Sequence, residues 1–439
     1  MSRAVPGRRT AGTAPVPALP SGDGPEWWPR VAREVADDLA VDAAARDRAG
    51  KPPFDEAARL REAGLPALLA PPEATAAPGG APRSPAGGRE TDWPAACAVV
   101  RELATADSSI GEILAHHYAL FRSARFFGAA ETAERFEREA AREGWLLAGG
   151  VFPPEGRTDD AIAARRVAGG HVLTGSRAFA TGVAVADRLV VGVRPSPGPA
   201  DLLAVLVDPA APGVLVQPAG DRPGQRLSGA GTVAFEDVLV PADAVLGTVP
   251  PEEYPGTALA ALAPLALRLI LAQVTLGTAE GALAEARDSS RAAWAGGAGP
   301  GGSGGFAGRD STDATDPYLL LAYGELSAAA LSAAAVLERA TLALGRGMAA
   351  AGALGADERA DIAVLVAVAE AVTGEVAVRL TSRLLELTDA AEAPDEGPGL
   401  DRFWRNARML TARNSPAHRL RDIGDHYLSG TRLRLTSYA

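Results

Sequence analysis

The spacing of apolar residues changes twice along this chain of 439 residues, and the change limits the possible folds more than any other feature. In residues 27–143 apolar positions recur three and four apart, as in the run 31–41, which is typical of helices with one buried face. In residues 144–247 short apolar runs such as 188–193 are separated by Gly, Pro and Asp turns, a pattern that indicates strands. The helical spacing returns after residue 259.

The helical spacing after residue 259 falls into four segments, and successive amphipathic helices of this kind predict a bundle. The segments are 262–287, 318–343, 357–387 and 402–410. Closely spaced strands with no helix between them favour a small antiparallel barrel or sandwich. We therefore expect an α+β protein with four parts: a disordered tail (1–24), an N-terminal helical domain (25–143), a central antiparallel β-domain (144–249) and a C-terminal helical bundle (250–439).

Two segments rich in small residues are predicted to be surface loops. Residues 71–88 are rich in Pro, Ala and Gly and interrupt the first helical part, and residues 296–308 are rich in Gly. The second segment does not follow a predicted strand and has no glycine pattern that ends in Lys. It is therefore a flexible connection and not a phosphate-binding loop.

Charge and cysteine content exclude several classes of function. The net charge of -11 disfavours nucleic-acid binding, because that needs a basic surface. The single cysteine, Cys97, cannot form an internal disulfide, and no Cys or His spacing indicates a metal site. We expect a cytoplasmic protein that binds no nucleic acid and no metal.

No segment is expected to lie in a membrane. The tail lacks the apolar core of a signal peptide. The apolar stretch 258–278 is interrupted by Pro264, Arg268 and Gln273, whereas a spanning helix needs about 20 largely apolar residues. This stretch is predicted to be a buried helix.

Two motifs near the end of the chain connect it to a known family. Residues 401–408 read Asp-Arg-Phe-Trp-Arg-Asn-Ala-Arg, and residues 423–430 read Ile-Gly-Asp-His-Tyr-Leu-Ser-Gly. Together with the order of helices, strands and bundle, they resemble the two-component flavin-dependent monooxygenases of the acyl-CoA dehydrogenase superfamily. In those relatives this region lies beside the flavin, so the resemblance implies that Arg405 and Asn406 bind the cofactor.

Three segments of the central part and its approach carry the same resemblance. Residues 171–182 resemble a strand and turn that ends beside the flavin N5 atom, where Thr181 would offer a hydroxyl that donates or accepts a hydrogen bond. Residues 226–241 match a mainly structural segment of the superfamily that contains Ser228, a further cofactor-binding candidate. Residues 144–150 resemble the strand whose backbone approaches the isoalloxazine.

Three further residues are assigned to the site by these segments and by the first helical part. Trp145 either binds the flavin or packs in the core, and Gly149 lets backbone approach closely because glycine has no Cβ. His117, in a segment that resembles a helix of the monooxygenases, falls on a histidine near the pocket. A neutral imidazole there could transfer a proton at physiological pH.

The chain departs from the family at two positions. Arg413 occupies the place of a histidine that helps activate oxygen, and because arginine stays protonated it could stabilise an anion but not act as a base. The arginine that reaches a cofactor phosphate is replaced by alanine, and Arg291 is the nearest substitute. The choice between FMN and FAD is therefore open.

Three functions remain open. The favoured one is a monooxygenase that receives reduced flavin from a separate reductase and uses O₂ to oxygenate a small aromatic or amine substrate. The second is an acyl-CoA dehydrogenase with Glu396 as the base, although Glu396 also fits a solvated acidic loop. The third is a member with weak flavin binding and non-redox chemistry. The resemblance also implies a homotetramer.

Overall fold

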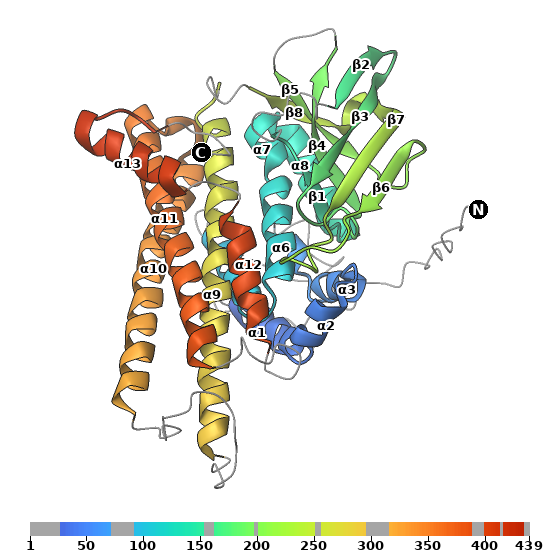
Figure 1. The fold of residues 1–439 in the computed structure, drawn as a ribbon. Coiled ribbons are helices and arrows are strands. Elements are labelled where there is room, and N and C mark those ends of the chain that lie inside the picture. Colours follow the sequence, from blue (N-terminus) through green and yellow to red (C-terminus); the bar gives the residue numbers. More distant parts are fainter. Residues whose placement is uncertain are drawn as a thin grey trace.

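A computed structural model describes most of the chain outside its N-terminal tail. The described residues are 27–71, 92–152, 162–196, 201–250, 256–295, 316–388, 399–412 and 416–433. The predicted tail (1–24), nearly all of the predicted loop 71–88, the predicted loop 296–308, and the site candidates Glu396 and Arg413 lie outside them. Figure 1 shows long helices side by side, with the sheet against one end of the helical assembly.

The first helical part contains α6, which lies between the bundle helix α9 and the strand β1 (Figure 1). Asp107 begins this helix, because its side chain accepts hydrogen bonds from the backbone N–H groups of Ser109 and Ile110 and so satisfies two free donors of the first turn. Nearly all of its side chains are buried. The helices are α1 (Trp27–Ala40), α2 (Ala43–Ala49), α3 (Phe54–Glu62), η1 (Leu65–Ala67), α5 (Asp92–Ala106), α6 (Ser108–Phe121), α7 (Ser123–Phe127) and α8 (Ala130–Glu143).

The central part is one sheet with the strand order β6-β7-β3-β2-β4-β5-β8, and β1 pairs with β4. The expectation of a purely antiparallel sheet was wrong, because β1 and β2 both run parallel to β4. Parallel neighbours need a long crossover, and β1 gains one because β2 and β3 separate it from β4 in the chain. The strands are β1 (Leu147–Gly150), β2 (Ala163–Val167), β3 (Gly170–Phe179), β4 (Arg188–Pro195), β5 (Leu202–Val207), β6 (Val214–Pro218), β7 (Gly231–Pro241) and β8 (Val245–Val249).

The last part is the predicted bundle, and its central helix is α9, which packs against α5, α10 and α11 and whose first part is largely buried. One hydrophobic core includes residues of α1, α9 and α12, so the two helical parts share it. A second core is formed by residues of the sheet. The proposed domain limits stay a prediction. The helices are α9 (Ala263–Ala295), α10 (Pro317–Ala350), α11 (Ala356–Leu387), α12 (Asp401–Thr411) and α13 (Pro416–Ser429).

By length and composition alone, two described helices could cross a membrane. The window in α9 is 89% buried within the fold, as expected of a core helix, and the window in α10 is 22% buried.

A buried ion triad fastens α13 to the bundle. Glu370 of α11 accepts hydrogen bonds from Arg268 of α9, with Nε 2.9 Å from Oε2, and its other oxygen lies 3.1 Å from Nη2 of Arg419 on α13. All three side chains are less than a tenth exposed. Buried charges are stable only when they are paired, so the triad requires all of its members.

His117 joins three separate elements through both nitrogens of its ring. Nε2 lies 2.8 Å from the carbonyl oxygen of Pro66 in η1, and Nδ1 accepts a hydrogen bond of 3.0 Å from the backbone N–H of Leu147 in β1. These partners require the neutral ring with its proton on Nε2. Burial lowers the pKa of His117 to about 4, because the charged form would be desolvated.

We predict that Glu370→Gln destabilises the protein by about 3 kcal/mol, because two buried guanidinium groups lose their shared carboxylate. Urea unfolding followed by circular dichroism measures this loss. The matched control is Glu386→Gln, because Glu386 forms an exposed pair with Arg383 and such pairs contribute at most about 1 kcal/mol. Equal effects of the two substitutions would contradict a structural role for the triad.

We also predict that His117 makes the stability depend on pH between about 6.5 and 4. Its pKa is lower in the folded than in the unfolded state, so its contribution is complete above pH 6.5 and is lost as the pH falls toward 4. The shift corresponds to about 3 kcal/mol. The measurement is the free energy of unfolding of the wild type and of His117→Gln from pH 8 to pH 4.

The difference between the two proteins should shrink as the pH is lowered. Asp107, whose pKa burial raises to about 6, titrates in both proteins and cancels in that comparison. A difference that stays constant with pH would show that the imidazole does not resist protonation.

Candidate functional site

The side-chain amide of Asn406 joins three parts of the chain at the predicted site. Its Oδ1 accepts a hydrogen bond of 2.6 Å from the backbone N–H of Gln225, in the loop before β7. Its Nδ2 donates to Oγ of Ser108, the first residue of α6, at 2.8 Å. Asn406 is 5% exposed, so solvent cannot replace these partners. We call this meeting point of α12, the loop 219–230 and the start of α6 the Asn406 junction.

The loop 219–230 also holds Thr181, which follows β3. The Thr181 hydroxyl donates to the carbonyl oxygen of Ser228 at 2.9 Å, and the Gly182 N–H donates to the same oxygen at 2.7 Å. Gly182 has a φ of 79°, and a Cβ there would lie 2.8 Å from Cβ of Ala148 in β1, so this turn requires glycine. Thr181 is buried, and its oxygen keeps lone pairs that can accept a further hydrogen bond.

Ser228 is held by its side chain as well. Its Oγ accepts a hydrogen bond of 2.7 Å from Nη1 of Arg222, which also lies 3.0 Å from the carbonyl oxygen of Ala180. The backbone N–H of Ser228 donates to the carbonyl oxygen of Gln225 at 3.1 Å. The structure therefore brings the predicted residues Thr181, Ser228 and Asn406 into one connected network.

Arg405, the fourth predicted residue near the junction, is engaged within the protein. Its guanidinium pairs with Asp401 at 2.9 Å and with Asp47 of α2, and it donates to the carbonyl oxygen of Pro223 at 3.1 Å. A Cβ on Gly224 would lie 2.5 Å from the Arg405 carbonyl oxygen, so the loop reaches α12 this closely only with glycine there. Its contact with a cofactor stays a prediction.

Trp145 and Gly149 lie on the approach to the sheet. Trp145 is 7% exposed, and the guanidinium of Arg188 lies 4.6 Å from the centre of its ring. Gly149 pairs with Val190 of β4, and a Cβ on it would lie 2.4 Å from the Val190 carbonyl oxygen. The pairing of β1 with β4 is therefore enough to require glycine at this position. No described contact tests the flavin-binding roles predicted for Trp145 and Gly149.

Arg291 and His117 do not join the network. Arg291 is exposed on the last turns of α9, and its described contacts do not connect it to the Asn406 junction. His117 lies on α6, as Ser108 does, but backbone groups use both of its nitrogens. In this arrangement the imidazole ring of His117 holds η1 and β1 in place. Proton transfer by His117 remains a hypothesis.

Gln225 was missed in the sequence analysis. It is fully buried, its φ is 52° although it is not glycine, and neither polar atom of its carboxamide has a hydrogen-bond partner in the described part of the chain. Left-handed backbone at such a residue is uncommon, and a buried amide without partners is costly. No sequence signal would have identified it, because a glutamine between Gly224 and Arg226 is typical of an ordinary exposed loop.

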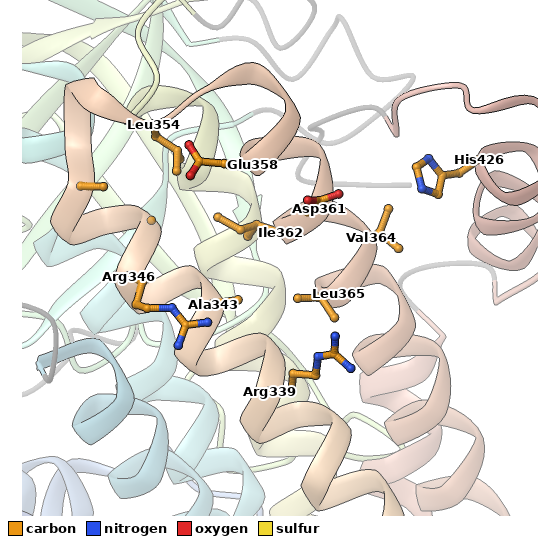
Figure 2. Close-up of a pocket in the computed structure, with 12 residues that line it drawn as sticks. Arg339, Ala343, Arg346, Leu354, Glu358, Asp361, Ile362, Val364, Leu365 and His426 are labelled. Atoms are coloured by element: carbon orange, nitrogen blue, oxygen red, sulfur yellow. The ribbon is translucent and has the colours of Figure 1, made fainter.

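A groove of about 550 Å³ lies away from this junction, between α10, α11 and α13. Figure 2 shows Arg339 and Arg346 on α10, Glu358 and Asp361 on α11, and His426 across from them. Its floor is apolar. None of the predicted site residues is among the described residues that line it, but His426 belongs to the motif 423–430, so this motif lies at the groove and not at the Asn406 junction.

Individual known proteins are similar to this chain over almost its whole length. No family model matches this chain. The dibenzothiophene monooxygenase of Rhodococcus qingshengii is 30% identical over 410 residues, which cover 91% of this chain and 93% of that protein. The probable FMNH2-dependent monooxygenase SfnC of Pseudomonas putida is 28% identical over 402 residues, which cover 92% and 95%.

Solved structures give the same result. The FMN-bound dibenzothiophene monooxygenase TdsC of Paenibacillus sp. A11-2 superposes with a TM-score of 0.81 at 30% identity, covering 94% of this chain and all of that one. Butyryl-CoA dehydrogenase of Megasphaera elsdenii, at 21% identity and a TM-score of 0.71, shares the fold. The predicted α+β class and acyl-CoA dehydrogenase fold are confirmed, with a mixed sheet in place of an antiparallel one. The chain belongs to the dibenzothiophene monooxygenase family of flavin-dependent monooxygenases, which have the acyl-CoA dehydrogenase fold.

Proposed function

We propose that this protein is the oxygenase of a two-component system: it takes reduced FMN from a separate flavin reductase and uses O₂ to oxygenate a small aromatic or amine substrate. The observation that carries the proposal is the match of more than nine tenths of the chain, α12 included, to monooxygenases of this type. Because the chain has one cysteine, and that is buried, we place both components in the reducing cytoplasm.

The residues of the Asn406 junction fit a flavin ring. The carboxamide of Gln225 has donors and an acceptor without described partners, and the hydroxyls of Thr181 and Ser108 lie in the same network. The polar edge of an isoalloxazine needs both donors and acceptors. When bound, reduced flavin supplies the two electrons that activate O₂. The protein binds and orients the ring through neutral groups, and the buried position of these groups excludes water.

The two other functions have less support. A short-chain acyl-CoA dehydrogenase of Megasphaera elsdenii matches only 199 residues, 44% of this chain, at 30% identity. Glu396, the base that such an activity would need, and Arg413, the residue that suggested altered chemistry, both lie outside the described residues. Their roles remain hypotheses.

The activity can be tested with the purified protein, FMN, NADH and a flavin reductase. We expect O₂-dependent oxygenation of indole or dibenzothiophene, detected by mass spectrometry with ¹⁸O₂, only when the reductase is present. Thr181→Val should lower the turnover about tenfold, the equivalent of one hydrogen bond, and Thr181→Ser should restore it. Ser332→Ala, which removes an exposed hydroxyl bonded to backbone on α10, is the matched control.

Two results would contradict this function. One is tightly bound FAD that loses its colour when an acyl-CoA is added, which would indicate a dehydrogenase. The other is the absence of oxygenated product with any of these substrates although reduced FMN binds.

We also propose that the protein forms a homotetramer through α10. Leu320, Leu331 and Leu342 are 54%, 71% and 44% exposed and follow one another at intervals of eleven residues, about three helical turns. They therefore form a stripe of leucines on one outer face of α10. Stripes of this kind on soluble proteins mark contacts with other chains, and a second copy is the occupant that the family resemblance implies.

Leu331→Glu should break this contact, because it places a charge in the middle of the stripe. Light scattering coupled to size exclusion should give the mass of a tetramer for the wild type and a smaller mass for the variant. Leu239→Glu, at a 63% exposed leucine on β7, is the control and should leave the mass unchanged. An unchanged mass for Leu331→Glu would exclude α10 as the contact.

A further inference from the structure

A small polar pocket of about 140 Å³ lies where α2, the loop 219–230 and α12 meet. We call it the guanidinium pocket. It contains four arginines, two aspartates and two small residues: Arg48, Arg226, Arg402, Arg405, Asp47, Asp401, Ala44 and Gly399. Each of the three segments belongs to a different part of the fold, so a ligand in this pocket would contact all three.

The positive charge of the pocket is only partly neutralised. Both of its carboxylates, Asp47 and Asp401, pair with Arg405. Arg402 pairs with Glu285 of α9, with Nη1 to Oε1 at 3.0 Å, and also donates to the Gly399 carbonyl oxygen. Two arginines therefore remain that pair neither with a carboxylate of the pocket nor with Glu285.

These two arginines are Arg226 and Arg48. Arg226 donates through Nη2 to Asp221 at 3.0 Å, but the Asp221 side chain is 84% exposed, and exposed pairs contribute little. Its Nε is buried and has no hydrogen-bond partner among the described residues. Arg48 makes no ion pair with any residue that the structure describes. Arginine keeps its charge at any accessible pH, so like charges accumulate here.

We propose that the guanidinium pocket binds phosphate, either as the free ion or as the phosphate of a monoester. A guanidinium presents its N–H groups in a planar fork that matches phosphate oxygens, and Arg226 and Arg48 are the groups available for it. The pocket has the space of about four or five water molecules, which is enough for a phosphate group. A bound phosphate pairs with the guanidinium groups that line the pocket and offsets the repulsion between the arginines.

The phosphate has two possible sources. It is either the free ion, which ties the three segments together, or the phosphate of FMN. The second source depends on the proposed function and the first does not. A ligand that binds only the folded protein raises its stability, so thermal unfolding reports binding of either kind.

The test titrates inorganic phosphate into the full-length protein by calorimetry, at an ionic strength held constant with sodium chloride, and follows the unfolding temperature in parallel. We expect saturable binding and a higher unfolding temperature for the wild type. Arg226→Gln and Arg48→Gln should each weaken phosphate binding at least tenfold. Arg339→Gln, an exposed arginine of the groove on α10, should bind phosphate as the wild type does.

Two results would overturn the proposal. One is a wild type that responds to phosphate no more than to chloride. The other is Arg226→Gln and Arg48→Gln variants that bind phosphate as tightly as Arg339→Gln. The Arg48 variant keeps the test decisive if Arg226→Gln does not fold, because no described ion pair of the fold depends on Arg48.

A second titration distinguishes the sources by comparing FMN with riboflavin, which lacks the phosphate. If the pocket holds the phosphate of FMN, inorganic phosphate competes with FMN and not with riboflavin, and Arg226→Gln reduces the preference for FMN about tenfold. If the free ion is the ligand, inorganic phosphate leaves the affinity for both flavins unchanged. Both titrations measure binding and not turnover, so a protein without monooxygenase activity still gives a result in each. Failure of the proposed function is therefore distinguishable from failure of the phosphate proposal.

Discussion

The site depends on one constraint, the fixed side-chain amide of Asn406. Its oxygen must accept from Gln225 and its nitrogen must donate to Ser108, so the amide has one permitted orientation. This holds the loop 219–230 against α12, and the loop in turn places the carbonyl oxygen of Ser228 that receives the Thr181 hydroxyl. A hydroxyl beside the sheet is thus positioned by an asparagine in the last helical part of the chain.

This chain of contacts needs backbone segments that approach each other more closely than side chains permit. Gly224 lies against the Arg405 carbonyl and Gly182 against Ala148, and in both places a Cβ would overlap its neighbour. Glycine is required at both positions, as it is at other close backbone contacts such as Gly149 against Val190. Both glycines lie next to residues of this network, so a larger residue at either position would displace the segments that form it.

The sequence predicted the parts of the structure that depend on local spacing or on the family resemblance. Periodicity gave the long helices, and the resemblance gave Thr181, Ser228 and Asn406. It could not give Ser108 as the partner of Asn406, because 298 residues separate them and tertiary packing alone brings them together. The parallel alignment of β1 with β4 was missed for the same reason, and the left-handed backbone of Gln225 was missed because its neighbours in sequence are typical of an exposed loop. His117 was located correctly on a helix, but its backbone partners could not be foreseen.

The arginines of α12 explain why its motif is so dense. Arg402 is buried and pairs with Glu285 of α9, and Arg405 is half-buried and pairs with Asp47 of α2. Buried charges need such partners, so these arginines fasten α12 to its neighbours. The hydroxyls of Thr181 and Ser108 and the amides of Gln225 and Asn406 are neutral, whereas Arg222 of the loop 219–230 donates to Ser228. Neutral groups suit a ring whose charge changes with its redox state, because a hydroxyl can turn to donate or accept, whereas a fixed charge would favour one state.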